Sequence, residues 1–271
     1  MTIECIEDFN DPRLDPYRHL RTTNLTRFSG RFIAESKPLV ARLIASPLEV
    51  ESILVDEKFL DEAKTWVPES ARIFVIGSDA ISQLIGFHFH RGYLACGFRP
   101  KAKPWQTQQI RELTSDWTGV FLIGVQDPEN MGSILRTCAA LGIQDILLGP
   151  ECVDPFARRV LRVSMGNAFK LHFYQCDQPL ETLAGFRQNQ VRTFAACLSP
   201  ASVELGSARR SGPTLVLLGN EAHGLPREII EASSDGVRID MSLGTDSLNV
   251  SVAAGIILHH LSRGIHRNDP T

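Results

Sequence analysis

The sequence predicts an α/β protein whose parallel sheet is covered by helices on both faces. Three observations indicate this class. Strand-like apolar runs alternate with helix-like runs along the chain. The run 119–125, GVFLIGV, is almost continuously apolar, which is typical of a parallel strand buried on both faces. Polar segments that contain glycine follow several strands, at the place where open α/β sheets bind ligands.

A change of composition divides the chain into two parts. The stretch 99–118 has two prolines and little apolar periodicity at its start. We therefore expect one domain at 1–104, a linker at 105–116 and a second domain at 117–271. In the first domain, strands are expected at 30–36, 50–56, 71–77 and 91–98, helices at 37–46 and 78–86, and a charged amphipathic segment at 57–67.

The second domain repeats the alternation. Its expected strands are 119–125, 145–149, 170–176, 193–198, 214–219 and 237–241. Its expected helices are 133–141, 154–165, 179–189, 227–233 and a last helix from Val250 on. The last helix has an apolar stripe at helical spacing, formed by Val250, Ala253, Ala254, Ile257, Leu258 and Leu261.

Composition excludes several classes of protein. The hydrophobic content of 43% is normal for a globular chain, and no apolar run reaches the roughly 20 residues of a membrane helix. The acidic N-terminus predicts no secretory signal. Six cysteines are scattered without a CxxC pair, so we expect no metal site, no disulfide framework and a cytoplasmic location.

The distribution of charge indicates that a polyanion would bind to local basic patches and not to the protein as a whole. The net charge is −3 and the pI about 6.2. Yet 87–111 and 156–170 carry arginines and lysines without any acid, and 13–31 carries five arginines against one aspartate. Solvated surface charge explains any one stretch equally well, but three together favour an acidic macromolecule such as nucleic acid.

The first polar junction is QDPENMGSILR at 126–136. Asp127, Asn130 and Gly132 suit a turn, and Ser133 is expected to cap the helix that follows. Arg136 would then lie close to the N-terminal end of that helix, where the helix dipole disfavours a cation. This unfavourable placement indicates a functional arginine, although turn chemistry alone also explains the loop.

The second junction is LLGNEAHGLP at 217–226. Two glycines bracket Glu221, which suits a base, a hydrogen-bond acceptor or a plain loop residue. His223 is interpreted as a loop or interface residue. The chain has no GxSxG motif, so a hydrolase triad has no nucleophile.

The third junction, at 238–255, places Ser247 and Asn249 before the last helix. These polar residues suit either helix capping or a binding site at a helix N-terminus. GxGxxG and GxxxxGK[ST] are both absent, which removes the ordinary dinucleotide and P-loop interpretations.

In this order, the three junctions resemble the signature motifs of the SPOUT superfamily, specifically the SpoU–TrmH type RNA 2′-O-ribose methyltransferases. The matching segments are DPENMGSILRTCAALG, LLGNEAHGL and IDMSLGTDSLNVSVAAG, and RVSMGNAF resembles an S-x-G element of the family. Together they span roughly 117–265. The first domain is similar, more loosely, to a ribosomal-protein-like substrate-binding domain, through GRFIAES and RGYLACGF.

The resemblance implies S-adenosylmethionine as methyl donor, a homodimer, and a trefoil knot in the second domain. The substrate would be the ribose of structured RNA, with rRNA favoured over tRNA. The catalytic residues implied are Arg136, Asn130, Glu221 and Asn249. The cofactor-binding residues implied are Leu218, Gly219, Asn220, Gly224, Ile239, Met241, Ser247 and Leu248.

Particular roles and two departures follow from the same resemblance. Arg136 is expected to bind a phosphate or stabilise the forming alkoxide, because a guanidinium stays protonated. Glu221 would hold Arg136 or accept the proton, and Ser247 would cap the last helix. Asp240 replaces the usual proline and would bring a carboxylate near the adenine, and Asn167 replaces the usual alanine of the S-x-G element.

Two other functions remain open on the sequence alone. One is an RNA-binding protein of the same fold without catalysis, against which the presence of Asn130, Arg136, Glu221 and Asn249 argues. The other is a methyltransferase acting on a base or a protein. Enzymes that methylate base amino groups typically carry a DPPY- or NPPY-like motif, which is absent here.

Overall fold

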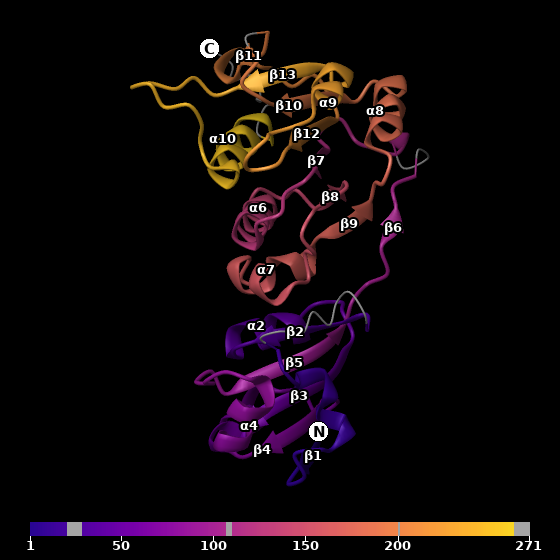
Figure 1. Ribbon diagram of the computed structural model, residues 1–271. Coiled ribbons are helices and arrows are strands. Elements are labelled where there is room, and N and C mark those ends of the chain that lie inside the picture. The colour runs from indigo at the N-terminus through magenta and orange to yellow at the C-terminus, as the bar shows by residue number, and fades with distance from the viewer. Residues whose placement is uncertain (21–28, 107–109, 200, 263–271) are drawn as a thin grey trace, which may run out of the picture. The chain divides into compact units, whose positions relative to one another are not determined.

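The computed structural model describes residues 1–20, 29–106, 110–199 and 201–262 (Figure 1). The chain divides into two units. The first unit comprises Met1–Lys101 and Asp154–Phe169, and the second comprises Ala102–Val153 and Lys170–Thr271. The segment 154–169 therefore belongs with the first unit, whereas its sequence position is inside the expected second domain.

A mixed five-stranded sheet forms the centre of the first unit, in the order β1-β4-β3-β5-β2. Strands β2 and β3 pair antiparallel with β5, and β1 and β3 pair parallel with β4. Its strands are β1 (Thr2–Cys5), β2 (Arg31–Glu35), β3 (Val50–Asp56), β4 (Arg72–Ile76) and β5 (Tyr93–Phe98), and its helices are η1 (Pro12–Tyr17), α2 (Lys37–Ile44), η2 (Glu57–Phe59), α3 (Leu60–Trp66) and α4 (Ser78–Ile85).

Aromatic packing explains why 154–169 joins the first unit. Helix α7 (Arg158–Val163) packs against β2. The ring of Phe32 lies 5.2 Å from that of Phe156 and 5.6 Å from that of Phe169, between centroids. Gly166 has a φ of 73°, and a Cβ there would lie 2.7 Å from Leu39 Cδ1. The glycine of the S-x-G element thus permits a close approach to α2.

The second unit is built on an eight-stranded sheet in the order β11-β13-β10-β12-β7-β8-β9-β6, and every pair in it is parallel. The predicted parallel sheet is therefore confirmed. The strands are β6 (Lys103–Pro104), β7 (Thr118–Leu122), β8 (Asp145–Leu148), β9 (His172–Gln175), β10 (Arg192–Ala196), β11 (Val203–Glu204), β12 (Thr214–Leu218) and β13 (Asp235–Arg238).

Helices cover this sheet on both faces (Figure 1). On one face α6 (Pro128–Ala140) packs against α10 (Val250–Ser262), which also contacts β12. On the other face α8 (Pro179–Gln188) contacts α9 (Arg227–Ala232) and β10. The turn η4 (Leu205–Ser207) follows β11, and η3 (Asn167–Lys170) precedes β9. Alternating strand residues thus bury apolar side chains in two layers.

Several expected boundaries were wrong. Helix α6 begins at Pro128, not at 133, because Asp127 caps it by accepting hydrogen bonds from the N–H groups of Glu129 and Asn130. Strand β13 spans Asp235–Arg238 in place of 237–241, since the chain leaves the sheet after Arg238. The expected linker is partly packed: Ile110 is buried in a core cluster of the second unit, against which Trp105 also packs.

Candidate active site

Three loops meet at the carboxyl edge of the second sheet, as the alternation of strands and helices predicts. They follow the neighbouring strands β7 and β12 and the strand β13. The side-chain amide of Asn220 donates to the carbonyl oxygen of Gly124 at 2.8 Å, and the Ile123 N–H donates to Leu218 O at 3.0 Å. These bonds fix the first loop against the second.

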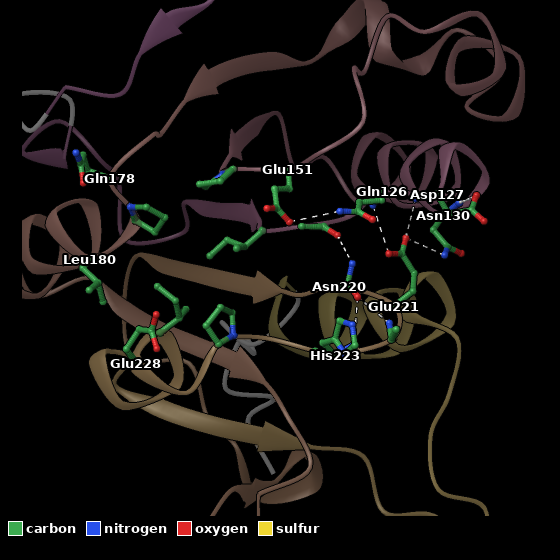
Figure 2. A pocket seen from close by; sticks show the side chains of 18 residues that line it. Gln126, Asp127, Asn130, Glu151, Gln178, Leu180, Asn220, Glu221, His223 and Glu228 are labelled. Atoms are coloured by element: carbon green, nitrogen blue, oxygen red, sulfur yellow. Dashed lines mark hydrogen bonds between the residues drawn. The ribbon is translucent and has the colours of Figure 1, made fainter.

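The carboxylate of Glu221 holds the start of α6 (Figure 2). Its Oε1 accepts from the Asp127 N–H and from Asn130 Nδ2, each at 3.1 Å, and its Oε2 accepts from the Gln126 N–H at 3.3 Å. A carboxylate beside a helix N-terminus is also favoured by the helix dipole. Both oxygens are thus engaged with the first loop, and neither contacts Arg136, contrary to one expected role for Glu221.

Asn249 connects the third loop to the other two. Its Nδ2 donates to Asn130 Oδ1 at 2.9 Å, while its Oδ1 accepts from the N–H and the hydroxyl of Ser251 at 2.8 and 2.7 Å. Asn249 is therefore the residue that caps α10, and the expectation that Ser247 caps this helix was wrong. The chain Asn249–Asn130–Glu221, called here the amide–carboxylate relay, joins all three motifs.

Arg136 lies apart from this relay. Because α6 begins at Pro128, Arg136 is more than two turns beyond its start, and the expected conflict with the helix dipole does not arise. Its side chain is exposed, and among the described residues it has no hydrogen-bond or ion-pair partner. It lines neither of the two cavities at this edge. The guanidinium is accordingly available to an external ligand.

A cavity of about 390 Å³ lies between the second and third loops, and we call it the first cavity. Its walls include the apolar side chains of Val237 and Ile257 and the backbone of both loops. The volume falls in the range of about 300–1,000 Å³ that is usual for small-molecule sites. It is lined by all eight expected cofactor residues: Leu218, Gly219, Asn220, Gly224, Ile239, Met241, Ser247 and Leu248.

Gly219 is required by the close packing of the second loop. A Cβ at this position would lie 2.4 Å from the carbonyl carbon of Gly224 and from the nitrogen of Leu225. The loop turns back on itself through paired hydrogen bonds, Asn220 N–H to Gly224 O at 3.0 Å and Gly224 N–H to Asn220 O at 2.9 Å. Asp240 does not line the first cavity, and its carboxylate pairs with Arg238 at 3.2 Å.

A second cavity of about 950 Å³ lies beyond the same edge (Figure 2). It shares the segment 220–224 with the first cavity and is also lined by Asn130. Among the other polar residues that line it, sequence reasoning did not single out Glu228 of α9, nor Gln126, Glu151 and Gln178. The last three follow three different strands, so no local motif marks them. Placement after a strand is the one signal they share with the motif residues.

Several arginines of the basic stretches pair with acids from other parts of the chain, and 21–28, with Arg21 and Arg27, lie outside the described residues. Arg31 pairs with Glu51 at 2.6 Å, and the hydrogen bond from Arg31 lowers the pKa of Glu51. Arg99 pairs with Asp154 at 3.2 Å. Burial lowers the pKa of Arg158, whose guanidinium lies 3.9 Å from Glu35. These stretches therefore expose less free positive charge than the sequence indicated.

Among the described residues, no helix is long and apolar enough to cross a membrane, and no group of three or more His, Cys, Asp or Glu side chains is placed to hold a metal ion.

Comparison with known proteins identifies relatives over the whole chain. Residues 118–259 match the model of the SpoU rRNA Methylase family. The chain is 33% identical over 281 aligned positions to an uncharacterized tRNA/rRNA methyltransferase of Mycobacterium tuberculosis, covering 100% of this chain and 95% of that one. It is 23% identical to the 23S rRNA (guanosine(2553)-2′-O)-methyltransferase of Bacillus subtilis, over 94% of this chain and 98% of that one.

A solved structure confirms the likeness of fold. The AdoMet-bound rRNA methyltransferase of Sinorhizobium meliloti superposes with a TM-score of 0.82 at 23% identity, covering 98% of this chain and 99% of that one.

Proposed function

The chain belongs to the SpoU rRNA methylase family, and from that premise we propose that it methylates a ribose 2′-hydroxyl of RNA with S-adenosylmethionine as donor. The observation that carries the proposal is the amide–carboxylate relay. It ties three separate loops into one edge beside a cavity whose wall contains every residue expected to hold the cofactor.

The residues of the first cavity suit this cofactor. Apolar walls from Ile239, Leu248 and Ile257 can cover an adenine ring, and the backbone groups of 218–220 can hydrogen-bond its edge. When bound, S-adenosylmethionine supplies an electrophilic methyl group on a sulfonium sulfur, which leaves as a neutral thioether. The methyl carbon forms a new bond to the ribose oxygen, and the hydroxyl proton is lost.

We assign the work of the protein to positioning and electrostatics. Glu221 is a positioning residue, because both of its oxygens already accept hydrogen bonds from the start of α6. Asn130 and Asn249 keep the three loops in register. Arg136 would bind the phosphate next to the target ribose, or stabilise the alkoxide as the proton leaves to water. Its exposure and its lack of a partner among the described residues support this role.

The substrate is proposed to be structured RNA in the cytoplasm, with rRNA favoured over tRNA. The relative from Bacillus subtilis is named for a 2′-O-methylation of 23S rRNA. The first unit would bind the RNA as a ribosomal-protein-like domain, and the second would carry out the chemistry.

A homodimer and a trefoil knot complete the proposal. Val252 and Ile256 on α10 are 50% and 41% exposed, which supports burial of this helix face against a second copy. Helix α10 follows β13 in sequence, yet it packs on α6 and β12. This return across the sheet supports threading of the third loop through the fold.

The test is methylation of total RNA from a strain that lacks the gene, using S-adenosylmethionine labelled in the methyl group. We expect label in alkali-resistant dinucleotides, because a 2′-O-methyl group protects the adjacent phosphodiester bond. Label in free bases or in protein would refute ribose methylation.

The alternative of an RNA-binding protein without catalysis makes a different prediction. In that case calorimetry would show no binding of S-adenosylmethionine. The intact relay and the cavity favour the enzyme.

A further inference from the structure

The second cavity is larger than the first, and the cofactor residues alone do not explain its other walls. It lies entirely within the second unit and is separated from the first cavity by the segment 220–224, which lines both. Figure 2 shows Glu151 and Gln126 on one wall and Leu180 and Glu228 on another. A ligand in it would therefore be adjacent to the cofactor residues and to Asn130.

Carboxylates are among the hydrogen-bond acceptors of this cavity, beside the amide oxygens of Gln126, Asn130 and Gln178. Gln126 Nε2 donates to Glu151 Oε2 at 3.4 Å, which leaves Glu151 Oε1 without a partner among the described residues. Glu151 has a φ of 60°, a left-handed conformation that costs energy for a residue with a Cβ and is common at functional sites. Glu228 is exposed, and it too has no partner in the described part of the chain.

Donors and apolar surface are also present. Helix α8 begins at Pro179 and no side chain of the described residues caps it, so the N–H groups of Leu180 and Glu181 have neither an intrahelical nor a capping partner at the cavity edge. Leu180 is 47% exposed there, and Ile123 and Ile229 line the same space. The cavity thus combines hydrogen-bonding groups of both kinds with flat apolar contacts.

We propose that the second cavity receives the base of the target nucleotide and selects guanine. The inference rests on the proposed function and names the base that the same site recognises. Carboxylates repel phosphate, so the base and not the backbone enters. Unpaired RNA bases are typically read on their Watson–Crick edges after leaving the stack.

Guanine matches these groups better than the other bases. Its Watson–Crick edge presents two neighbouring donors, N1–H and the 2-amino group, which a carboxylate accepts together. Its O6 accepts from an amide or a backbone N–H. Uracil presents two carbonyl oxygens around its single N–H and would place an acceptor against a carboxylate. Inosine lacks only the 2-amino group, so it isolates that contact.

The test measures nucleoside binding to the full chain saturated with S-adenosylhomocysteine, by ligand-observed NMR titration. We expect guanosine to bind at least about tenfold more tightly than inosine, with uridine weaker still. Glu151→Gln and Glu228→Gln should each reduce the preference for guanosine. Glu204→Gln, an exposed substitution outside both cavities, is the matched control and should leave the preference unchanged.

The outcomes separate this inference from the function on which it rests. If S-adenosylhomocysteine binds but the nucleosides bind equally or not at all, base selection is wrong and methyl transfer stands. If S-adenosylhomocysteine does not bind, both fall. A thermal melt of each variant shows whether it is folded, and two separate carboxylates keep the test decisive if one variant is unstable.

Discussion

The side-chain amide of Asn249 donates to the side-chain oxygen of Asn130 at 2.9 Å, across 119 residues of sequence. The same side chain caps α10 through its oxygen. One residue therefore performs both of the functions that the sequence left open for the start of this helix, capping and construction of the site. Because the two functions use different atoms, mutation can separate them.

Asn249→Ser should retain the cap and lose the amide, whereas Asn249→Ala should lose both. We expect Asn249→Ala to destabilise the protein by about 1 kcal/mol and Asn249→Ser by much less. Both should reduce methylation, because the relay is broken in each. Urea unfolding and methyl-transfer rates check this. Full activity in Asn249→Ser would show that the contact with Asn130 is dispensable.

Arg136→Ala should reduce methylation by about 10²–10³-fold while the binding of S-adenosylmethionine stays largely intact. The reason is that Arg136 lines neither cavity and has no partner among the described residues. The free energy of unfolding of this variant should differ from that of the wild type by less than about 0.5 kcal/mol. Single-turnover kinetics and calorimetry measure the two effects. Turnover like that of the wild type would refute the assigned role.

Gly219→Ala should abolish cofactor binding and destabilise the second unit by about 1–3 kcal/mol. The new Cβ would lie 2.4 Å from backbone atoms, which cannot move without opening the second loop. Gly206→Ala is the control, because its nearest neighbour is Glu204 Oε1 at 3.7 Å. Calorimetry and thermal melting compare the two variants. Equal cofactor affinities would contradict the described loop.

The buried thiol of Cys138 and the partly buried thiol of Cys152 should resist alkylation. Burial raises the pKa of Cys152 from 9.0 to about 11 and that of Cys138 from 9.0 to about 12. At pH 8 the thiolate fraction of Cys152 should be about 100-fold below that of an unperturbed thiol. A pulse of iodoacetamide followed by peptide mass spectrometry should label the exposed Cys5 first. Equal labelling of Cys152 and Cys5 would contradict this burial.

The same pKa values predict the direction of the pH dependence of stability. The folded-state pKa lies above the unfolded value, so the protonated thiol favours the folded state. This contribution is complete below about pH 9 and is lost as the pH rises toward 12. Cys138→Ala should therefore lose less stability than the wild type between pH 9 and pH 11 in urea unfolding.

The amino-acid sequence by itself determined the class of fold and the order of the motifs. Apolar runs such as 119–125 indicate buried parallel strands, because this pattern depends only on neighbouring residues. The carboxyl ends of parallel strands lie at one edge of the sheet in any order of the strands. The resemblance to the family supplied eight of the residues that line the first cavity.

Only the tertiary structure decided which side chains meet and which charges stay free. Arg31 looks unpaired along the chain, yet Glu51 reaches it across the sheet at 2.6 Å. Glu221 was expected near Arg136 but holds the start of α6, because the loop that ends at Asp127 brings its N–H groups to that carboxylate and α6 brings the side-chain amide of Asn130. A hydrogen bond or ion pair forms only when two atoms from distant segments lie within a few tenths of an ångström of the right distance. A pattern along the sequence does not encode that distance.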